Sequence, residues 1–128
     1  RFYNDYKTGQ AQFQADIKIK SGCSRASVMQ IFGATTQSTA FMAWTIDNKL
    51  THYSGGSFYS PVFDRYLTLN VLHDTKTGKV SVYVNRVLRG TFTDHGRTNH
   101  YFKAGVYHQK GMSSRCDVYL KNIHMFQK

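Results

Sequence analysis

The stretch YFKAGVYHQ, residues 101 to 109, decides the predicted fold of this 128-residue chain. In a β-strand, successive side chains point to opposite faces of the sheet. One face of such a strand would carry the polar side chains Tyr101, Lys103, Tyr107 and Gln109. The other face would carry Phe102, Ala104, Val106 and His108. The pattern predicts a strand with one polar and one mainly apolar face.

A second stretch, VMQIFG at residues 28 to 33, has the same character. Gln30 and Phe32 would point to one side of this strand, and Met29 and Ile31 to the other. We therefore predict a concave sheet on which the Gln30 carboxamide meets the Lys/Tyr/Gln row of residues 101 to 109.

Most of the remaining chain also has strand patterns bounded by turn residues. We expect further strands at residues 11–19, 40–46, 50–53, 66–74, 80–84 and 118–126, with turns at 47–49 and at Asn85-Arg86. Residues 55–57 are predicted to form a flexible loop. No helical period, internal repeat or linker is found. The sequence predicts a single domain over residues 1–128, an all-β antiparallel jelly-roll sandwich of the concanavalin A-like lectin and glucanase type.

The charge balance points to an anionic partner. Lys and Arg number 17 against 7 acidic residues, and all seven are Asp. Without any Glu, a glycosidase site with two opposed glutamates is excluded, and scattered Asp residues are typical of turns. The partner could be a polyuronate, a nucleic acid or another anionic polymer. No run of five like charges and no nucleic-acid-binding module is present, so we do not expect a nucleic-acid partner.

The cysteines and the first residue indicate in which cellular compartment the protein is found. Cys23 and Cys116 are too far apart for a C-x-x-C redox or zinc motif, which leaves a disulfide or two buried thiols. A secreted domain with an even cysteine count usually pairs them, so we predict a disulfide. The chain begins with Arg1 and contains no signal-like or membrane-spanning apolar segment. We therefore expect a processed, extracellular product without a membrane partner.

The histidines do not have the spacing of a metal motif. They are His52, His73, His95, His100, His108 and His124. His95 and His100 share a loop, but a histidine pair without carboxylates is a weak metal signal. We expect neither a metal nor an organic cofactor. His100 is a candidate proton shuttle at the mouth of the predicted cleft.

The two strand motifs resemble the YFKAGxYxQ and Q-[IV]-x motifs of the alginate-lyase-like polysaccharide lyases, a jelly-roll group that includes glucuronan lyases and plant citrate-binding-type proteins. The order and spacing of the flanking segments match along nearly the whole chain. Phe32 stands where alginate lyases usually carry a histidine. The upstream R-x-E-x-R strand of the family is absent, and Arg1 could be at most its last arginine. A separate N-terminal peptide of the same precursor could complete the sandwich.

The resemblance implies secreted polysaccharide lyase chemistry, a β-elimination at a 1,4-linked uronic acid. In that case Gln30 would neutralise the C6 carboxylate, Tyr107 would serve as base and acid, and Lys103 would lower the pKa of Tyr107. The substrate would also meet Gln109, Tyr101, Phe32, His100 and Arg1. With Phe32 in the histidine position, only a syn elimination by one tyrosine is available, which favours glucuronan or mannuronan over guluronan.

A non-catalytic protein on the same fold is the alternative. The citrate-binding-type relatives share the Phe variant, so the same cleft could bind an acidic carbohydrate or a carboxylate as a lectin-like protein does. Tyr101 and Tyr107 could then be ordinary amphipathic strand residues, and Gln30 a cross-strand amide.

Overall fold

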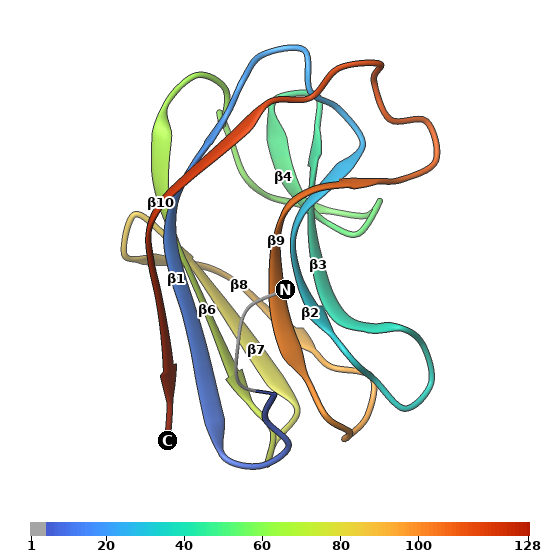
Figure 1. Ribbon diagram of the computed structural model, residues 1–128, viewed down its shortest axis with the longest axis vertical. Coiled ribbons are helices and arrows are strands. Elements are labelled where there is room, and N and C mark those ends of the chain that lie inside the picture. The colour runs from blue at the N-terminus through green and yellow to red at the C-terminus, as the bar shows by residue number, and fades with distance from the viewer. Residues whose placement is uncertain (1–4) are drawn as a thin grey trace.

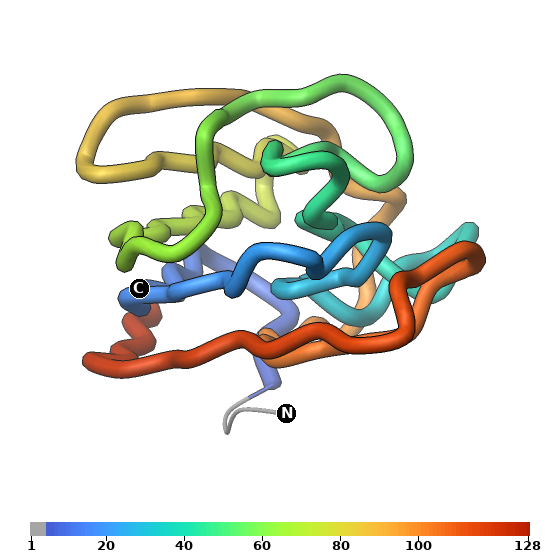
Figure 2. Tube along the Cα trace, turned by 90° about the horizontal axis from the view of Figure 1, so that it is seen from above, coloured from blue at the N-terminus to red at the C-terminus, as the bar shows by residue number. Residues whose placement is uncertain are grey.

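The computed structural model describes residues 5–128 and consists of two five-stranded antiparallel sheets packed face to face. Figure 1 shows the two layers from the side, and Figure 2 looks along the strands with the sheets next to each other. In the described part of the chain, no helix is long and apolar enough to cross a membrane. The predicted all-β jelly-roll sandwich is confirmed.

The first sheet has the strand order β10-β1-β6-β7-β8. Its strands are β1 (Gln10–Ile19), β6 (Tyr66–Asp74), β7 (Lys79–Val84), β8 (Val87–Thr93) and β10 (Val118–Gln127). The second sheet has the order β5-β4-β3-β2-β9. Its strands are β2 (Ala26–Phe32), β3 (Thr39–Ile46), β4 (Lys49–His52), β5 (Ser57–Tyr59) and β9 (Tyr101–His108).

The core lies between the two sheets because the strands bury every second side chain. Along β1 the five residues from Ala11 to Ile19 that face inward are each 1% exposed, while their neighbours are half-buried or exposed. The rings of Phe13 on β1 and Phe102 on β9 lie 5.7 Å apart and join the two layers. Burial of this apolar surface is the main force that holds the sheets together.

Two hairpins turn on residue pairs with positive φ angles. Asp47 and Asn48 have φ values of 49° and 66°, and Asn85 and Arg86 have values of 51° and 69°. Two consecutive left-handed residues match the twist of the flanking strands, which confirms both predicted turns. The sequence missed β5, since a three-residue edge strand after Gly55 and Gly56 is too short to show an alternating pattern.

The Cys23–Cys116 disulfide is present, as predicted. Cys23 follows β1 and is 1% exposed, while Cys116 precedes β10. The bond joins residues 93 positions apart, so it encloses most of the chain in one covalent loop. A cross-link over such a long loop reduces the conformational freedom of the unfolded chain considerably.

We expect the double variant Cys23→Ala/Cys116→Ala to lose about 2–5 kcal/mol of unfolding free energy, because the unfolded chain regains the entropy that the cross-link removes. Urea titrations of wild type and variant at neutral pH measure this loss. A reducing agent should lower the wild-type midpoint and leave that of the variant unchanged. Equal midpoints for the two proteins would show that the bond does not contribute.

Candidate functional site

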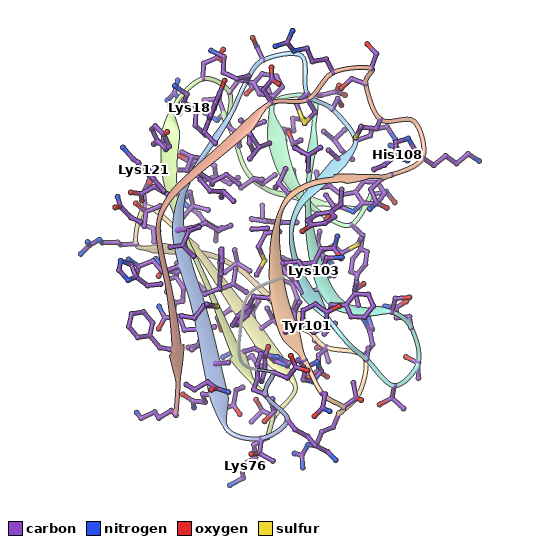
Figure 3. The ribbon with its side chains drawn as sticks, viewed as in Figure 1. Lys18, Lys76, Tyr101, Lys103, His108 and Lys121 are labelled. Atoms are coloured by element: carbon purple, nitrogen blue, oxygen red, sulfur yellow. A yellow bond between two sulfur atoms is a disulfide. The ribbon has the colours of Figure 1, made fainter. Side chains whose placement is uncertain are left out.

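The outer side of the second sheet carries three rows of side chains across β3, β2 and β9. Residues directly opposite each other on paired strands point to the same face. The register gives the rows Thr39–Phe32–Tyr101, Met42–Gln30–Lys103 and Trp44–Ser27–Tyr107. We call the set Gln30, Phe32, Tyr101, Lys103 and Tyr107 the polar face. Figure 3 shows Tyr101 and Lys103 on the side of β9 that faces away from the β1 sheet.

A bulge in β9 sets the direction of Tyr107. Between the pairs Met29–Ala104 and Ser27–Tyr107, β9 has two residues opposite the single Val28. Gly105 occupies this bulge with a φ of 146°, a conformation that disfavours residues with a side chain. Val106, which we expect on the apolar face, is 38% exposed beside this bulge.

Lys103 is the centre of an aromatic cluster. Its ammonium nitrogen lies 4.3 Å from the ring centroid of Tyr107 and 5.3 Å from that of Phe32. The Phe32 ring in turn stacks on Tyr101 at 5.1 Å. A cation over the face of a ring is attracted by the ring quadrupole. These contacts hold the charge of Lys103 above the middle of the polar face.

The pKa of Tyr107 is raised above its ordinary value, first by burial of the phenol and then by the nearby Tyr101. Lys103 is not among the causes of this shift, and the net direction is upward in spite of the nearby ammonium group. The ammonium group of Lys103 lies over the ring face, where it interacts with the π system. At neutral pH the Tyr107 phenol is therefore protonated and available as a hydrogen-bond donor or an acid.

Gln30 and Gln109 have different surroundings. Gln30 lies directly opposite Lys103 and is 4% exposed, so its carboxamide is part of the floor of the polar face. Gln109 follows the end of β9, where its carbonyl oxygen accepts a hydrogen bond of 3.0 Å from the N–H of Met112. Arg1 lies outside the described residues.

His100 is not at the mouth of a cleft, which corrects the sequence expectation. Its side chain is fully buried, and its Nδ1 donates to the carbonyl oxygen of Gly33 at 2.8 Å. His100 is the residue before Tyr101, so its side chain points to the side of the sheet opposite to that of Tyr101. It enters the core, where its ring lies 5.3 Å from that of Tyr6. His100 therefore cannot contact a ligand on the polar face.

Trp44 and Arg25 extend this surface, and the sequence analysis missed both. Trp44 lies in the same row as Ser27 and Tyr107, and the Arg25 guanidinium is 5.4 Å from its ring centroid. Arg25 also donates through Nε to the carbonyl oxygen of Lys110 at 2.8 Å. Nearly all of β3 is buried on both faces, so its sequence has no alternation that would mark Trp44 as part of a site.

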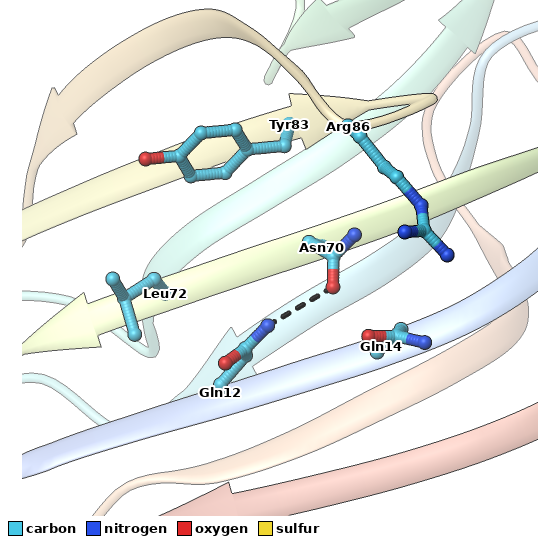
Figure 4. A pocket seen from close by; sticks show the side chains of 6 residues that line it. All are labelled: Gln12, Gln14, Asn70, Leu72, Tyr83 and Arg86. Carbon is cyan, nitrogen blue, oxygen red and sulfur yellow. Dashed lines mark hydrogen bonds between the residues drawn. The ribbon is translucent and has the colours of Figure 1, made fainter.

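A second surface lies on the outer side of the first sheet. A groove of about 400 Å³ is lined by Gln12, Gln14, Asn70, Leu72, Tyr83 and Arg86, which Figure 4 shows from close by. The Gln12 amide donates to Asn70 Oδ1 at 3.0 Å. We call this the amide groove. It offers amides, one tyrosine and one guanidinium, but it lacks the paired lysine and tyrosine of the polar face.

A cluster of ionisable side chains lies inside the sandwich. His73 Nε2 is 2.8 Å from Asp94 Oδ2, and the Tyr6 hydroxyl is 2.7 Å from His73 Nδ1. The rings of His73 and His100 lie 4.7 Å apart. Burial is the main cause that lowers the pKa of both histidines and raises that of Tyr6. No local sequence pattern indicates this cluster, because its members are far apart along the chain.

The comparisons with known proteins agree with the resemblance of the two motifs. No protein-family model matches the chain. A citrate-binding protein from Hevea brasiliensis is 31% identical over 125 residues, which cover 97% of this chain and 52% of that protein. The chain therefore spans about half the length of this relative.

Solved structures of alginate lyases have the same fold. Alginate lyase AlgAT5 from polysaccharide lyase family 7 superimposes with a TM-score of 0.71 at 22% identity, covering 94% of this chain and 60% of that one. A variant of the family 7 alginate lyase A1-II′ in complex with substrate gives a TM-score of 0.74 at 17% identity, covering 98% and 63%. The resemblance to the alginate-lyase-like and citrate-binding-type proteins is confirmed.

The buried histidines predict that acid destabilises the protein. His73 and His100 bind protons near pH 6.5 in the unfolded chain, whereas burial keeps them neutral to lower pH in the native state. The unfolded state then binds more protons, so the unfolding free energy should fall below about pH 6.5, by at most ~1.4 kcal/mol per pH unit for each histidine.

Urea titrations between about pH 8 and pH 5 in buffer with EDTA measure this slope. The variant His100→Gln should have a smaller slope than wild type, because one proton-binding group is lost from the difference. His124→Gln replaces an exposed histidine on β10 and is the matched control. A wild-type stability that is constant over this range would contradict the prediction.

Proposed function

We propose that the polar face binds a 1,4-linked polyuronate, glucuronan or mannuronan, and cleaves it by a syn β-elimination in which Tyr107 is both base and acid. This proposal is based on the arrangement of Gln30, Lys103 and Tyr107 on the same outer face of the second sheet. An amide donor and an ammonium group lie opposite each other on β2 and β9, and the tyrosine lies directly beside the ammonium group. An anionic polymer would be attracted by the formal charge of +10.

The elimination can be written with these side chains alone. The amide of Gln30 donates to the C6 carboxylate of the uronate, and Lys103 balances the negative charge that develops on it. The Tyr107 phenolate takes the C5 proton, the C4–C5 double bond forms, and the bond from C4 to the leaving oxygen breaks. The same proton then passes from Tyr107 to that oxygen, which regenerates the phenolate.

The stereochemistry follows from having a single proton-transfer group. In glucuronate and mannuronate, the C5 hydrogen and the C4 oxygen lie on the same side of the ring, so one tyrosine can serve both. Guluronate needs groups on opposite sides. Phe32 offers no proton-transfer group and instead stacks on Tyr101, which gives this part of the polar face an apolar wall.

The alginate lyase structures support this proposal, since one of them was solved with substrate. The Cys23–Cys116 disulfide is typical of oxidising compartments and supports an extracellular location, where an acidic polysaccharide would be met. The chain spans less than two thirds of those lyases.

Binding of a carboxylate without catalysis is the second candidate function. Two observations favour it: the relative with 31% identity is a citrate-binding protein, and the pKa of Tyr107 is raised. A high pKa makes the phenolate scarce at neutral pH. Gln30 and Lys103 would still recognise a carboxylate, and Tyr107 would donate a hydrogen bond to it.

If Tyr107 is the catalytic group, Tyr107→Phe should lower kcat by at least ~10²-fold and leave most of the affinity for oligoglucuronate, because only a hydroxyl is lost. The unsaturated uronate product is followed by its ultraviolet absorbance. Tyr83→Phe, which removes a hydroxyl from the amide groove, should keep wild-type activity.

For wild type, kcat/KM should rise with pH towards pH 10, since the raised pKa of Tyr107 limits the fraction of the enzyme that carries a phenolate at neutral pH. Ligand binding without any product would leave the binding function as the correct one.

The variants Gln30→Ala and Lys103→Met should each weaken oligoglucuronate binding by about tenfold or more, the effect of losing a hydrogen bond to a charged group. Arg86→Ala in the amide groove and Lys121→Met on β10 are the matched controls and should bind as wild type does. Calorimetric titration with oligoglucuronate and, separately, with citrate distinguishes a polymer site from a small-carboxylate site. If only Arg86→Ala weakened binding, the ligand would lie in the amide groove.

A further inference from the structure

The cluster inside the sandwich has the composition of a metal site. Nitrogen atoms of His73 and His100 and a carboxylate oxygen of Asp94 all lie within 4.8 Å of one another. His73 belongs to β6 of the first sheet, while Asp94 and His100 lie in the segment that leads from β8 to β9. Both histidines are fully buried. The three side chains therefore meet where the two sheets are connected.

The hydrogen bonds fix which nitrogen atoms carry protons. A carbonyl oxygen only accepts, so Nδ1 of His100 must be the protonated nitrogen that donates to Gly33. The Nε2 atom of the neutral ring is then unprotonated and carries a lone pair. It is buried without a hydrogen-bond partner among the described residues. A buried polar atom without a partner calls for a physical explanation, such as a bound water or ion.

The same reasoning applies to His73. Its Nε2 lies beside the carboxylate of Asp94, which only accepts, so Nε2 carries the proton and Nδ1 accepts from the Tyr6 hydroxyl. The Asp94 carboxylate lies within 4.8 Å of a ring nitrogen of His100, and neither the carboxylate nor the His100 Nε2 lone pair has a proton to give to the other. A cation between these groups would satisfy both.

We propose that His73, Asp94 and His100 form a binding site for Zn²⁺ that joins the two sheets beside β9. Two imidazoles and one carboxylate suit Zn²⁺, whereas Mg²⁺ and Ca²⁺ prefer oxygen ligands. Zinc distances of about 2.0–2.2 Å place tetrahedral ligand atoms about 3.4 Å apart. On zinc binding, His73 Nε2 and Asp94 Oδ2 must therefore move apart from 2.8 Å, while the widest separation within the set, at most 4.8 Å, must shrink.

The number of bound protons is unchanged when zinc binds. His73 changes its tautomer: Nε2 gives up its proton and binds the metal, Nδ1 gains a proton and donates to the Tyr6 oxygen, and the Tyr6 hydroxyl turns its own proton away from Nδ1. His100 binds through the lone pair on Nε2 and keeps its bond to Gly33. A ligating histidine that donates its other N–H to a neighbour is the usual outer shell of a zinc site. This site does not depend on the proposed lyase function.

The experiment uses the whole protein, first treated with EDTA and dialysed. Calorimetric titration with ZnCl₂ should give one ion per chain, and the Tm should rise by at least ~5 °C at a hundredfold excess over Kd, while MgCl₂ should have no effect. His100→Ala and Asp94→Asn should lose this ion. The matched controls His108→Ala and His124→Ala, which replace exposed histidines, should keep it. Tyr6→Phe should weaken binding about 10–100-fold, since it removes the partner of His73.

Because a core variant can fail to fold, wild type supplies an independent measurement. Nitrogen NMR of the histidine rings should show Nε2 of His73 and His100 shifting on zinc addition, together with the change of tautomer at His73. Absorption bands of Co²⁺ in the same site should indicate four-coordination, with the three side chains and one water as ligands. No binding of zinc, binding that persists in folded His100→Ala and Asp94→Asn, or unchanged ring signals of both histidines would each overturn the proposal.

Discussion

The antiparallel pairing of β2 with β9 is the constraint on which the polar face depends. These strands are about 75 positions apart along the chain, and their register places Gln30 opposite Lys103 and Phe32 opposite Tyr101. A shift of β9 by one residue would turn Lys103 towards the core, away from Gln30, and bring apolar side chains of β9 to the surface. The buried side chains of both strands therefore fix the register, and the register brings the functional groups together.

Lys103 has a more complex role than a charge beside a tyrosine. Its ammonium group lies over two aromatic rings, so its charge is available to a ligand above the sheet while the pKa of Tyr107 is raised by burial. This arrangement suits recognition of a carboxylate directly. For catalysis it requires the ligand and the neighbouring groups to make the phenolate accessible. The two candidate functions therefore share one binding geometry and differ in the protonation state of Tyr107.

The interior of the sandwich is chemically distinct from its outer face. Tyr6, His73, Asp94 and His100 form a buried network between the sheets, next to the strand that carries Tyr101 and Lys103. Buried polar groups are costly unless all of them are satisfied. The unpartnered Nε2 of His100 is thus one of the buried polar atoms that a ligand would satisfy.

The sandwich, most of its strands, both hairpin turns and the common face of Tyr101, Lys103 and Tyr107 could be predicted from the amino-acid sequence. These features follow from alternation along the chain and from turn residues, which are local properties. The orientation of His100, the exposure of Val106, the raised pKa of Tyr107 and the contact of His73 with Asp94 could not be predicted and follow from the three-dimensional packing. The bulge at Gly105 and the packing of one sheet on the other set these features. Both depend on contacts between residues distant in sequence, and no local pattern records them.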